Sequence, residues 1–231
     1  MALKALDLFC RAGGASMGLK QAGFDVIGVD RIYSKNYPFQ KIVGDAFEVL
    51  TWLDLGMFDF IWASPPCQQF SKATPSARRA MHDDLIEPTR AALEASGKSY
   101  CMENVECAPL RPDVVLTGDM FGLNTYRKRI FEVNFPVLAP APGPRFGPET
   151  RPGSVTVAGG GGGSAGTFSA WCDAMGIHWM NRREIVQAVP PAYARFIADW
   201  AKNAIDDRAE MLLAHGQAEK MAGQARILPS E

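Results

Sequence analysis

Short apolar runs alternate with helical patterns along the first 135 residues of this 231-residue chain. The patterns predict strands at residues 3–9, 25–30, 41–44, 58–63, 99–102 and 129–133, and helices at 14–22 and 83–96. Strands that alternate with helices usually pair in one direction and are covered by helices on both faces. The sequence therefore predicts an α/β fold with a mainly parallel, doubly wound sheet.

The pattern changes after residue 135. Prolines recur from 136 to 152 and an unbroken glycine run occupies 159–163, so neither a helix nor a long strand is expected there. Asn181, with Glu184 three residues later, fits a capping box, and an amphipathic helix is predicted at 192–204. A charged tail at 206–231 is expected as a frayed helix.

Composition narrows the class of protein. The formal net charge is −1 and 47% of the residues are hydrophobic, which is typical of a folded soluble domain. No apolar run reaches the roughly 20 residues that span a bilayer, and the first residues lack a signal-peptide pattern. Five cysteines without a CxxC spacing indicate neither a disulfide framework nor a zinc site. We expect a reduced, cytoplasmic protein without a bound metal.

A glycine turn follows the first predicted strand and opens a helix; it reads Asp7-Leu-Phe9-Cys-Arg11-Ala-Gly13-Gly14. Glycines let the backbone turn sharply and approach a ligand closely, as in nucleotide-binding turns. Asp30 ends the next strand, where a carboxylate can hold ribose hydroxyls, and Asp45 follows the third, where it can meet an adenine amino group. The alternative is a glycine turn of the kind that any α/β protein contains.

A cysteine and a carboxyl group follow the next two predicted strands. Cys67 lies in Ser64-Pro65-Pro66-Cys67-Gln68, where the polar, loop-like surroundings favour a reactive thiolate over a buried structural cysteine. Glu103, in Glu103-Asn104-Val105, is expected to face the same crevice, unless it is an ordinary surface glutamate. The segment Arg127-Lys128-Arg129 precedes the last strand and is either part of the site or an exposed basic cluster.

These residue sets, in this order, resemble the DNA cytosine-5 methyltransferase family. The family's Asp-Leu-Phe…Gly-Gly turn, Pro-Cys-Gln and Glu-Asn-Val motifs and Arg-x-Arg pair are present, and Ala188-Val-Pro-Pro191 resembles its C-terminal cofactor-site segment. The resemblance covers residues 3–135 and 180–204. It implies a Rossmann-like class I methyltransferase fold with a catalytic domain of residues 1–135 and 180–205. Residues 136–179 would be a reduced, Gly/Pro-rich target-recognition region.

The resemblance implies methyl transfer from S-adenosylmethionine to C5 of cytosine in double-stranded DNA, with S-adenosylhomocysteine as product. Cys67 is then the nucleophile that adds to C6, and Glu103 holds the N3 edge of the ring and supplies a proton. Arg129 binds the carbonyl oxygen at C2, with Arg127 supporting a phosphate or the loop. The implied cofactor-binding residues are Asp7, Phe9, Arg11, Gly13, Gly14, Asp30, Asp45, Pro66, Gln187 and Val189.

A stacked and paired cytosine must be flipped out of the duplex to reach such a site. The expected DNA contacts lie beside the pocket mouth: Gln68, Ser71, Lys72, Arg78, Arg79 and Lys128, with Arg182 and Arg183 as further candidates. Because the recognition region is short, we expect short or loose sequence specificity, with Arg145, Arg151 and the glycine run making backbone contacts. We expect a monomer or a weak dimer.

The sequence departs from the family pattern near the cofactor. Arg11 stands where glycine is usual, and Val186-Gln187 replace the usual Gly-Asn; Thr125 replaces a glutamine before the arginines. One hypothesis is that Arg11 and Gln187 accommodate a modified cofactor with an extra carboxylate.

Two other functions stay open. The same chemistry on a free cytidine nucleotide or on RNA would fit the short recognition region. A non-catalytic DNA- or cofactor-binding relative is the third, against which intact Cys67 and Glu103 argue. The motifs do not indicate the target sequence, nor whether the role is restriction protection, viral DNA modification or regulation.

Overall fold

The computed structural model describes residues 2–71, 74–141, 155–157 and 166–225. Its centre is a seven-stranded sheet in the order β3-β2-β1-β4-β5-β7-β6. The strands are β1 (Lys4–Leu8), β2 (Asp25–Asp30), β3 (Gln40–Val43), β4 (Phe60–Ala63), β5 (Ser99–Asn104), β6 (Val114–Leu116) and β7 (Arg129–Val133). The first five are parallel, and β7 runs antiparallel to its neighbours β5 and β6. The predicted α/β fold with a mainly parallel sheet is confirmed.

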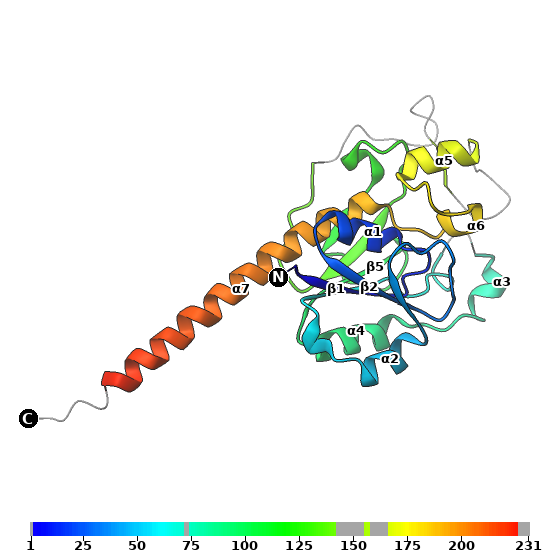
Figure 1. Ribbon diagram of the computed structural model, residues 1–231. Coiled ribbons are helices and arrows are strands. Elements are labelled where there is room, and N and C mark those ends of the chain that lie inside the picture. Colours follow the sequence, from blue (N-terminus) through cyan, green and yellow to red (C-terminus); the bar gives the residue numbers. More distant parts are fainter. Residues whose placement is uncertain (1, 72–73, 142–154, 158–165, 226–231) are drawn as a thin grey trace, which may run out of the picture.

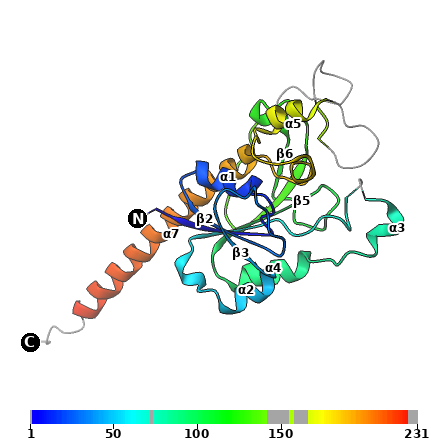
Figure 2. The same ribbon diagram turned by 45° about the vertical axis from the view of Figure 1, so that its right-hand side comes forward.

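Helices cover both faces of the sheet (Figure 1). On one face lie α1 (Gly14–Gln21) and α7 (Pro191–Ala225), and on the other α2 (Ala46–Trp52) and α4 (Ile86–Ala95). The same layers are visible after rotation, with α5 on the α1 side (Figure 2). Figure 1 shows α6 on this side as well. The other helical segments are α3 (Ser76–Arg79), α5 (Phe168–Met175), α6 (Arg182–Ile185), η1 (Leu55–Met57) and η2 (Gly118–Phe121).

Two hydrophobic cores follow from these layers. Leu19 of α1 and Tyr193 of α7 are fully buried against Trp62 and Phe131 on one face of the sheet. On the other face, Ile86 and Leu93 of α4 pack with apolar side chains of the central strands. Because both faces are covered, the central strands are apolar on both sides, as the continuous run of β4 shows.

A third, smaller core lies beside the first. Trp171 and Met175 of α5 pack with Val155, Ile185 and Ala12 of the glycine turn. In the region at 136–179, Val155 and α5 thus pack on the turn after β1. The role of this region in target recognition stays a prediction, as does the division of the chain into domains.

Several element boundaries differ from the predictions. The helix expected at 83–96 begins at Ile86, and the helix expected at 192–204 continues through the predicted tail to Ala225, projecting from the rest of the chain (Figure 1). The short elements α2 and β6 were not predicted, because seven and three residues carry too little periodicity. The capping box of Asn181 and Glu184 is confirmed.

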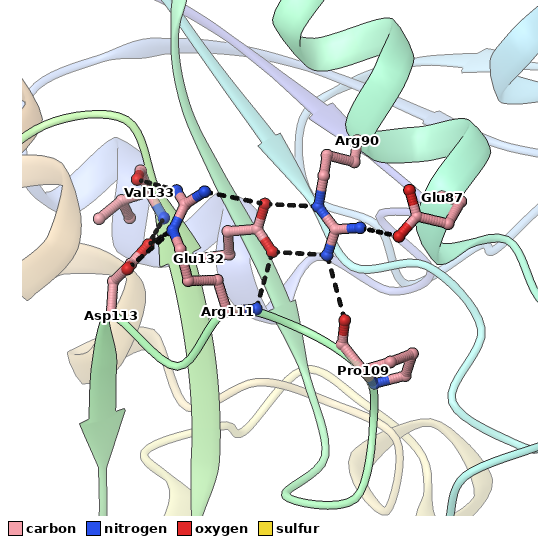
Figure 3. A network of polar contacts seen from close by, with 7 residues as sticks. All are labelled: Glu87, Arg90, Pro109, Arg111, Asp113, Glu132 and Val133. Carbon is pink, nitrogen blue, oxygen red and sulfur yellow. Dashed lines mark hydrogen bonds and ion pairs between the residues drawn. The ribbon is translucent and has the colours of Figure 1, made fainter.

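A buried ion-pair network joins α4 to β7 (Figure 3). Glu132 is 0% exposed, and its two carboxylate oxygens accept hydrogen bonds from Nε and Nη2 of Arg90, each at 2.7 Å. The backbone N–H of Arg111 adds a third bond at 2.9 Å. Burial raises the pKa of Glu132, but the bonds from Arg90 outweigh it and hold the pKa below its ordinary value. The charge of Glu132 therefore depends on Arg90.

Arg90→Met is expected to lower the free energy of unfolding by about 3 kcal/mol, because it removes both guanidinium bonds to the buried carboxylate of Glu132 and leaves the Arg111 N–H and the Arg111 guanidinium, 3.9 Å away, as its partners. Glu87→Gln is the matched control, since Glu87 pairs with the same arginine from a side chain that is 74% exposed. It should cost less than about 1 kcal/mol. Urea unfolding followed by circular dichroism measures both; equal losses would contradict the assignment.

Candidate active site

The cysteine loop is fixed by the strand beside it. Cys67 lies beyond the end of β4, and Asn104 at the end of β5 donates a 2.9 Å hydrogen bond to the carbonyl of Pro65. The carbonyl of Cys67 accepts from the backbone N–H groups of Phe70 and Ser71, at 3.0 and 2.8 Å. Asn104 is 1% exposed, so its amide is a rigid support. The loop therefore holds Cys67 at the carboxyl edge of the parallel strands.

Glu103 and Arg129 meet on neighbouring strands. Glu103 of β5 is 5% exposed, and its Oε1 lies 3.0 Å from Nε of Arg129, the first residue of β7. A hydrogen bond from Ser64 also reaches Glu103, and the indole N–H of Trp62 donates to Ser64 Oγ at 2.8 Å. The structure thus brings the predicted residues Glu103 and Arg129 together beside the cysteine loop.

Burial dominates the electrostatics of this cluster. It raises the pKa of Cys67, and the carboxylate of Glu103 raises it further, while Arg129 acts in the opposite direction. The expectation that the loop favours a thiolate is therefore wrong for the ligand-free protein, because Cys67 is more buried than an open loop would leave it. Burial likewise raises the pKa of Glu103, against the lowering effect of Arg129. Both groups hold their protons more strongly than usual.

Arg127 binds backbone carbonyl groups. Its Nε and Nη2 donate to Ala188 at 3.0 and 2.6 Å, Nη2 also to Val186 at 2.9 Å, and Nη1 to Val157 at 2.9 Å. Tyr193 Oη donates back to the carbonyl of Arg127 at 3.0 Å. Burial first, and then Arg129, lower the pKa of Arg127, but a guanidinium stays charged at neutral pH. Of the two predicted roles, loop support fits these contacts, and contact with a phosphate stays a prediction.

The turn after β1 has an unusual backbone. Phe9 and Arg11 have φ values of 62° and 46°, and Gly13 has 84°. Gly14 is required for packing, because a Cβ there would collide with the backbone carbonyl of Val189. The carboxylate of Asp30 stabilises the turn by accepting from the N–H groups of Arg11 and Ile32, at 2.9 and 2.8 Å. Asp30 therefore supports the turn whether or not it also holds a ribose.

A pocket lies between this turn and the C-terminal segment. Predicted residues in its wall are Asp7, Phe9, Arg11, Gly14, Gln187 and Val189. Ser64 and Glu184 line it as well and were not predicted; Ser64 could have been found from its place beside the Pro-Cys motif. Glu184 is tied to the loop after β2, accepting from Ser34 and Asn36 at 2.9 and 2.7 Å.

Four predicted cofactor residues lie outside the wall of this pocket; one is Asp30, whose hydrogen bonds to the turn are given above. Asp45 caps α2 by accepting from the N–H groups of Phe47 and Glu48, at 2.9 and 3.1 Å, and pairs with Arg31 at 2.8 Å. Gly13 faces the ring of Tyr37, 3.0 Å from where its Cβ would be. The fourth is Pro66, on the cysteine loop. Their roles in cofactor binding stay predictions.

Asp7 gives the pocket an unpaired acceptor. It is 0% exposed, its Oδ2 accepts from Ser16, and its Oδ1 has no hydrogen-bond partner among the described residues. Burial raises the pKa of Asp7 to about 7. A buried carboxyl oxygen without a partner is costly unless a ligand satisfies it. The pocket thus suits a ligand that carries a positive charge or an N–H donor, as an amino acid or a sulfonium compound does.

The predicted DNA contacts lie on several separate elements. Gln68 and Ser71 are partly buried near Cys67, Arg78 and Arg79 lie on α3, and Lys128 lies 3.4 Å from Glu106. Arg182 at the start of α6 stacks over Trp171, 4.6 Å from the ring centre. Lys72, Arg145, Arg151 and the glycine run at 159–163 lie outside the described residues. DNA contact stays a prediction for all of them.

In the described ranges, no group of three or more histidine, cysteine, aspartate or glutamate side chains could hold a metal ion. No helix in the same part of the chain is long and apolar enough to cross a membrane.

Comparison with known proteins gives a family match. Residues 3–108 match the C-5 cytosine-specific DNA methylase family. The type II methyltransferase M.FnuDI of Fusobacterium nucleatum is 31% identical over 115 residues, covering 45% of this chain and 33% of that protein. M.AgeI of Thalassovita gelatinovora is 26% identical over 182 residues, covering 63% and 41%. The chain thus spans less than half the length of these two relatives.

A solved structure supports the fold. The Entamoeba histolytica methyltransferase EhMeth superposes with a TM-score of 0.55 at 10% sequence identity, covering 89% of this chain and 99% of that chain. At this identity the likeness concerns the arrangement of strands and helices alone.

Proposed function

Because the chain belongs to the DNA cytosine-5 methyltransferase family, we propose that it methylates C5 of cytosine in double-stranded DNA, with S-adenosylmethionine as methyl donor. The observation that carries the proposal is the cluster of Cys67, Glu103 and Arg129. A half-buried thiol, a carboxyl group of raised pKa and a guanidinium converge where β4, β5 and β7 meet.

Cys67 supplies the nucleophile. Its thiol loses a proton to solvent and the sulfur adds to C6 of the cytosine ring, which ends the ring's aromaticity and leaves C5 with the character of an enamine. Glu103, whose pKa burial raises, donates a proton to N3 as the addition proceeds, so no negative charge accumulates on the ring. Arg129, already oriented by Glu103, donates to the carbonyl oxygen at C2.

The pocket beside this cluster fits the methyl donor. When bound, S-adenosylmethionine supplies a methyl group that its sulfonium makes electrophilic. The unpaired oxygen of Asp7 would accept from the positively charged end of the cofactor, and Phe9 and Val189 would contact its apolar parts. After methyl transfer the C5 proton passes to solvent, Glu103 takes its proton back from N3, and Cys67 leaves C6 as a thiolate that regains a proton from solvent. The net products are methylcytosine, S-adenosylhomocysteine and one proton.

The target cytosine must leave the helix to reach Cys67, because C6 is inaccessible in a stacked duplex. Arg78 and Arg79 on α3, with Lys128, would hold the flanking phosphates. A free cytidine nucleotide or RNA is the alternative substrate. Reading a DNA sequence needs side chains held rigidly against base edges, and the short segment between β7 and α5 offers few of them.

Incubation with radiolabelled S-adenosylmethionine tests the substrate. Duplex DNA of mixed sequence should become labelled, while deoxycytidine monophosphate and RNA should not, and sequencing of deaminated DNA should locate the label at C5 of cytosine in a short or degenerate context. Labelling of the nucleotide or of RNA alone would replace the proposed substrate. Absence of label in all three would contradict the activity.

A further inference from the structure

Arg11 has a conformation that its residue type disfavours. Its φ of 46° lies in the left-handed region, where glycine fits without strain and a long side chain does not. Both backbone groups are held in place: the N–H donates to Asp30 at 2.9 Å, and the carbonyl accepts from Nζ of Lys41 at 2.7 Å. Strained residues that the surrounding structure holds so firmly cluster at ligand sites, so the side chain needs an explanation.

The guanidinium of Arg11 is oriented but not neutralised. Its Nε and Nη2 both donate to Oε1 of Gln187, at 3.0 and 2.6 Å, across 176 positions of sequence. An amide oxygen is neutral and fixes the direction of the guanidinium without cancelling its charge. Among the described residues, no carboxylate forms an ion pair with Arg11, and its Nη1 donates no hydrogen bond. Arg11 therefore keeps donors and a positive charge for a ligand.

The pocket thus holds two complementary groups. Asp7 presents a buried, unpaired carboxyl oxygen, and Arg11 presents a guanidinium in the wall of the same pocket. An α-amino acid carries an ammonium and a carboxylate, which match these two groups. The positions 11 and 187, both unusual against the family pattern, contact each other, which indicates that they act as a pair.

We propose that Arg11, oriented by Gln187, binds a carboxylate in this pocket. The inference rests on the proposed function, because the carboxylate belongs to the methyl donor. Two sources share this chemistry: the amino-acid carboxylate of S-adenosylmethionine, and a carboxylate on the group attached to its sulfonium. A guanidinium offers paired N–H donors to either.

Isothermal titration calorimetry of the full chain tests the site without turnover. The ligands are S-adenosylhomocysteine, its decarboxylated analogue, S-adenosylmethionine, and a sulfonium analogue that carries a carboxymethyl group in place of the methyl. Arg11→Gly should lower the affinity for S-adenosylhomocysteine by about 10- to 100-fold, the range for a hydrogen bond to a charged group. The affinity for the decarboxylated analogue should not change. Arg11→Lys should restore part of the affinity, and Gln187→Ala should show a smaller loss.

Thermal unfolding of the free protein separates binding from folding. Arg11→Gly removes the strain of an arginine in the left-handed region, but glycine also raises the conformational entropy of the unfolded chain. The midpoint temperature of unfolding should therefore fall only slightly or not at all. If the loss of affinity is confined to the carboxymethyl analogue, the carboxylate is that of the sulfonium group. If all four ligands bind Arg11→Gly as tightly as the wild type, the site is refuted while the proposed function stands. If the wild type binds none of the four, both fail.

Discussion

Replacing Cys67 with serine is expected to slow methyl transfer to duplex DNA by at least about a thousandfold, in line with the loss of a covalent nucleophile. The hydroxyl of serine scarcely ionises near neutral pH and is a weaker nucleophile than sulfur, so addition to C6 would fail. Because transfer needs a thiolate at Cys67 and a proton on Glu103, the wild-type rate should follow a bell-shaped pH profile, falling at low pH as the thiolate fraction shrinks and at high pH as Glu103 loses its proton. Single-turnover transfer of labelled methyl groups measures both effects.

A covalent trap identifies the bond directly. In duplex DNA with 5-fluorocytosine, fluorine replaces the C5 proton that must leave, so the adduct with Cys67 should survive a denaturing gel. The wild type should form this adduct and Cys67→Ser should not. Cys107→Ser is the matched control, since Cys107 is an exposed free cysteine outside the proposed machinery and its loss should change neither readout. An adduct in Cys67→Ser would disprove the assigned nucleophile.

Glu103→Gln is expected to cause the second large loss of activity, slowing methyl transfer by about 100- to 10,000-fold. A glutamine keeps the shape and a hydrogen bond but has no acidic proton for N3, so negative charge would develop on the ring during addition. The 5-fluorocytosine adduct should form correspondingly slowly. Rapid-quench measurement of adduct formation isolates this step from DNA release.

Folding and binding must be checked in the same variant, because glutamine leaves the half-buried Arg129 without its carboxylate. Circular dichroism and the affinity for S-adenosylhomocysteine should stay close to the wild type if the defect is chemical. Glu94→Gln, on the exposed surface of α4, is the control and should transfer methyl groups at the normal rate. A Glu103→Gln protein that is folded and fully active would refute the proton-donor role.

Prediction from sequence succeeded for residues whose position in the fold is set by the strand that they belong to or directly follow. The buried runs of β4 and β5 are short and apolar, and polar motifs follow or complete them. The parallel register pairs Ala63 with Met102, so the segments that follow both strands emerge at one edge of the sheet. The proximity of Cys67 and Glu103 was predictable for this reason.

Prediction failed, or was silent, where the surroundings of a side chain in the folded protein decide its pKa or its hydrogen-bond partners. The polar loop predicted a thiolate at Cys67, but burial together with Glu103 raises its pKa. The assignment of Asp45 to a ligand stays a prediction, and the sequence was silent on the cap that its carboxylate forms on α2 and on its pair with Arg31. A motif gives the residue type at a position, but not which neighbours occupy its donors and acceptors.

The sequence by itself determined most of the strands and helices, the mainly parallel sheet, and the edge on which the chemical groups gather, because hydrophobic periodicity and turn residues act locally along the chain. Only the tertiary structure decided that Arg127 binds the carbonyls of the C-terminal segment, and that Arg11 is held by Gln187. Those contacts join segments about 60 and 176 residues apart. Their geometry depends on how the layers pack, which no local pattern contains.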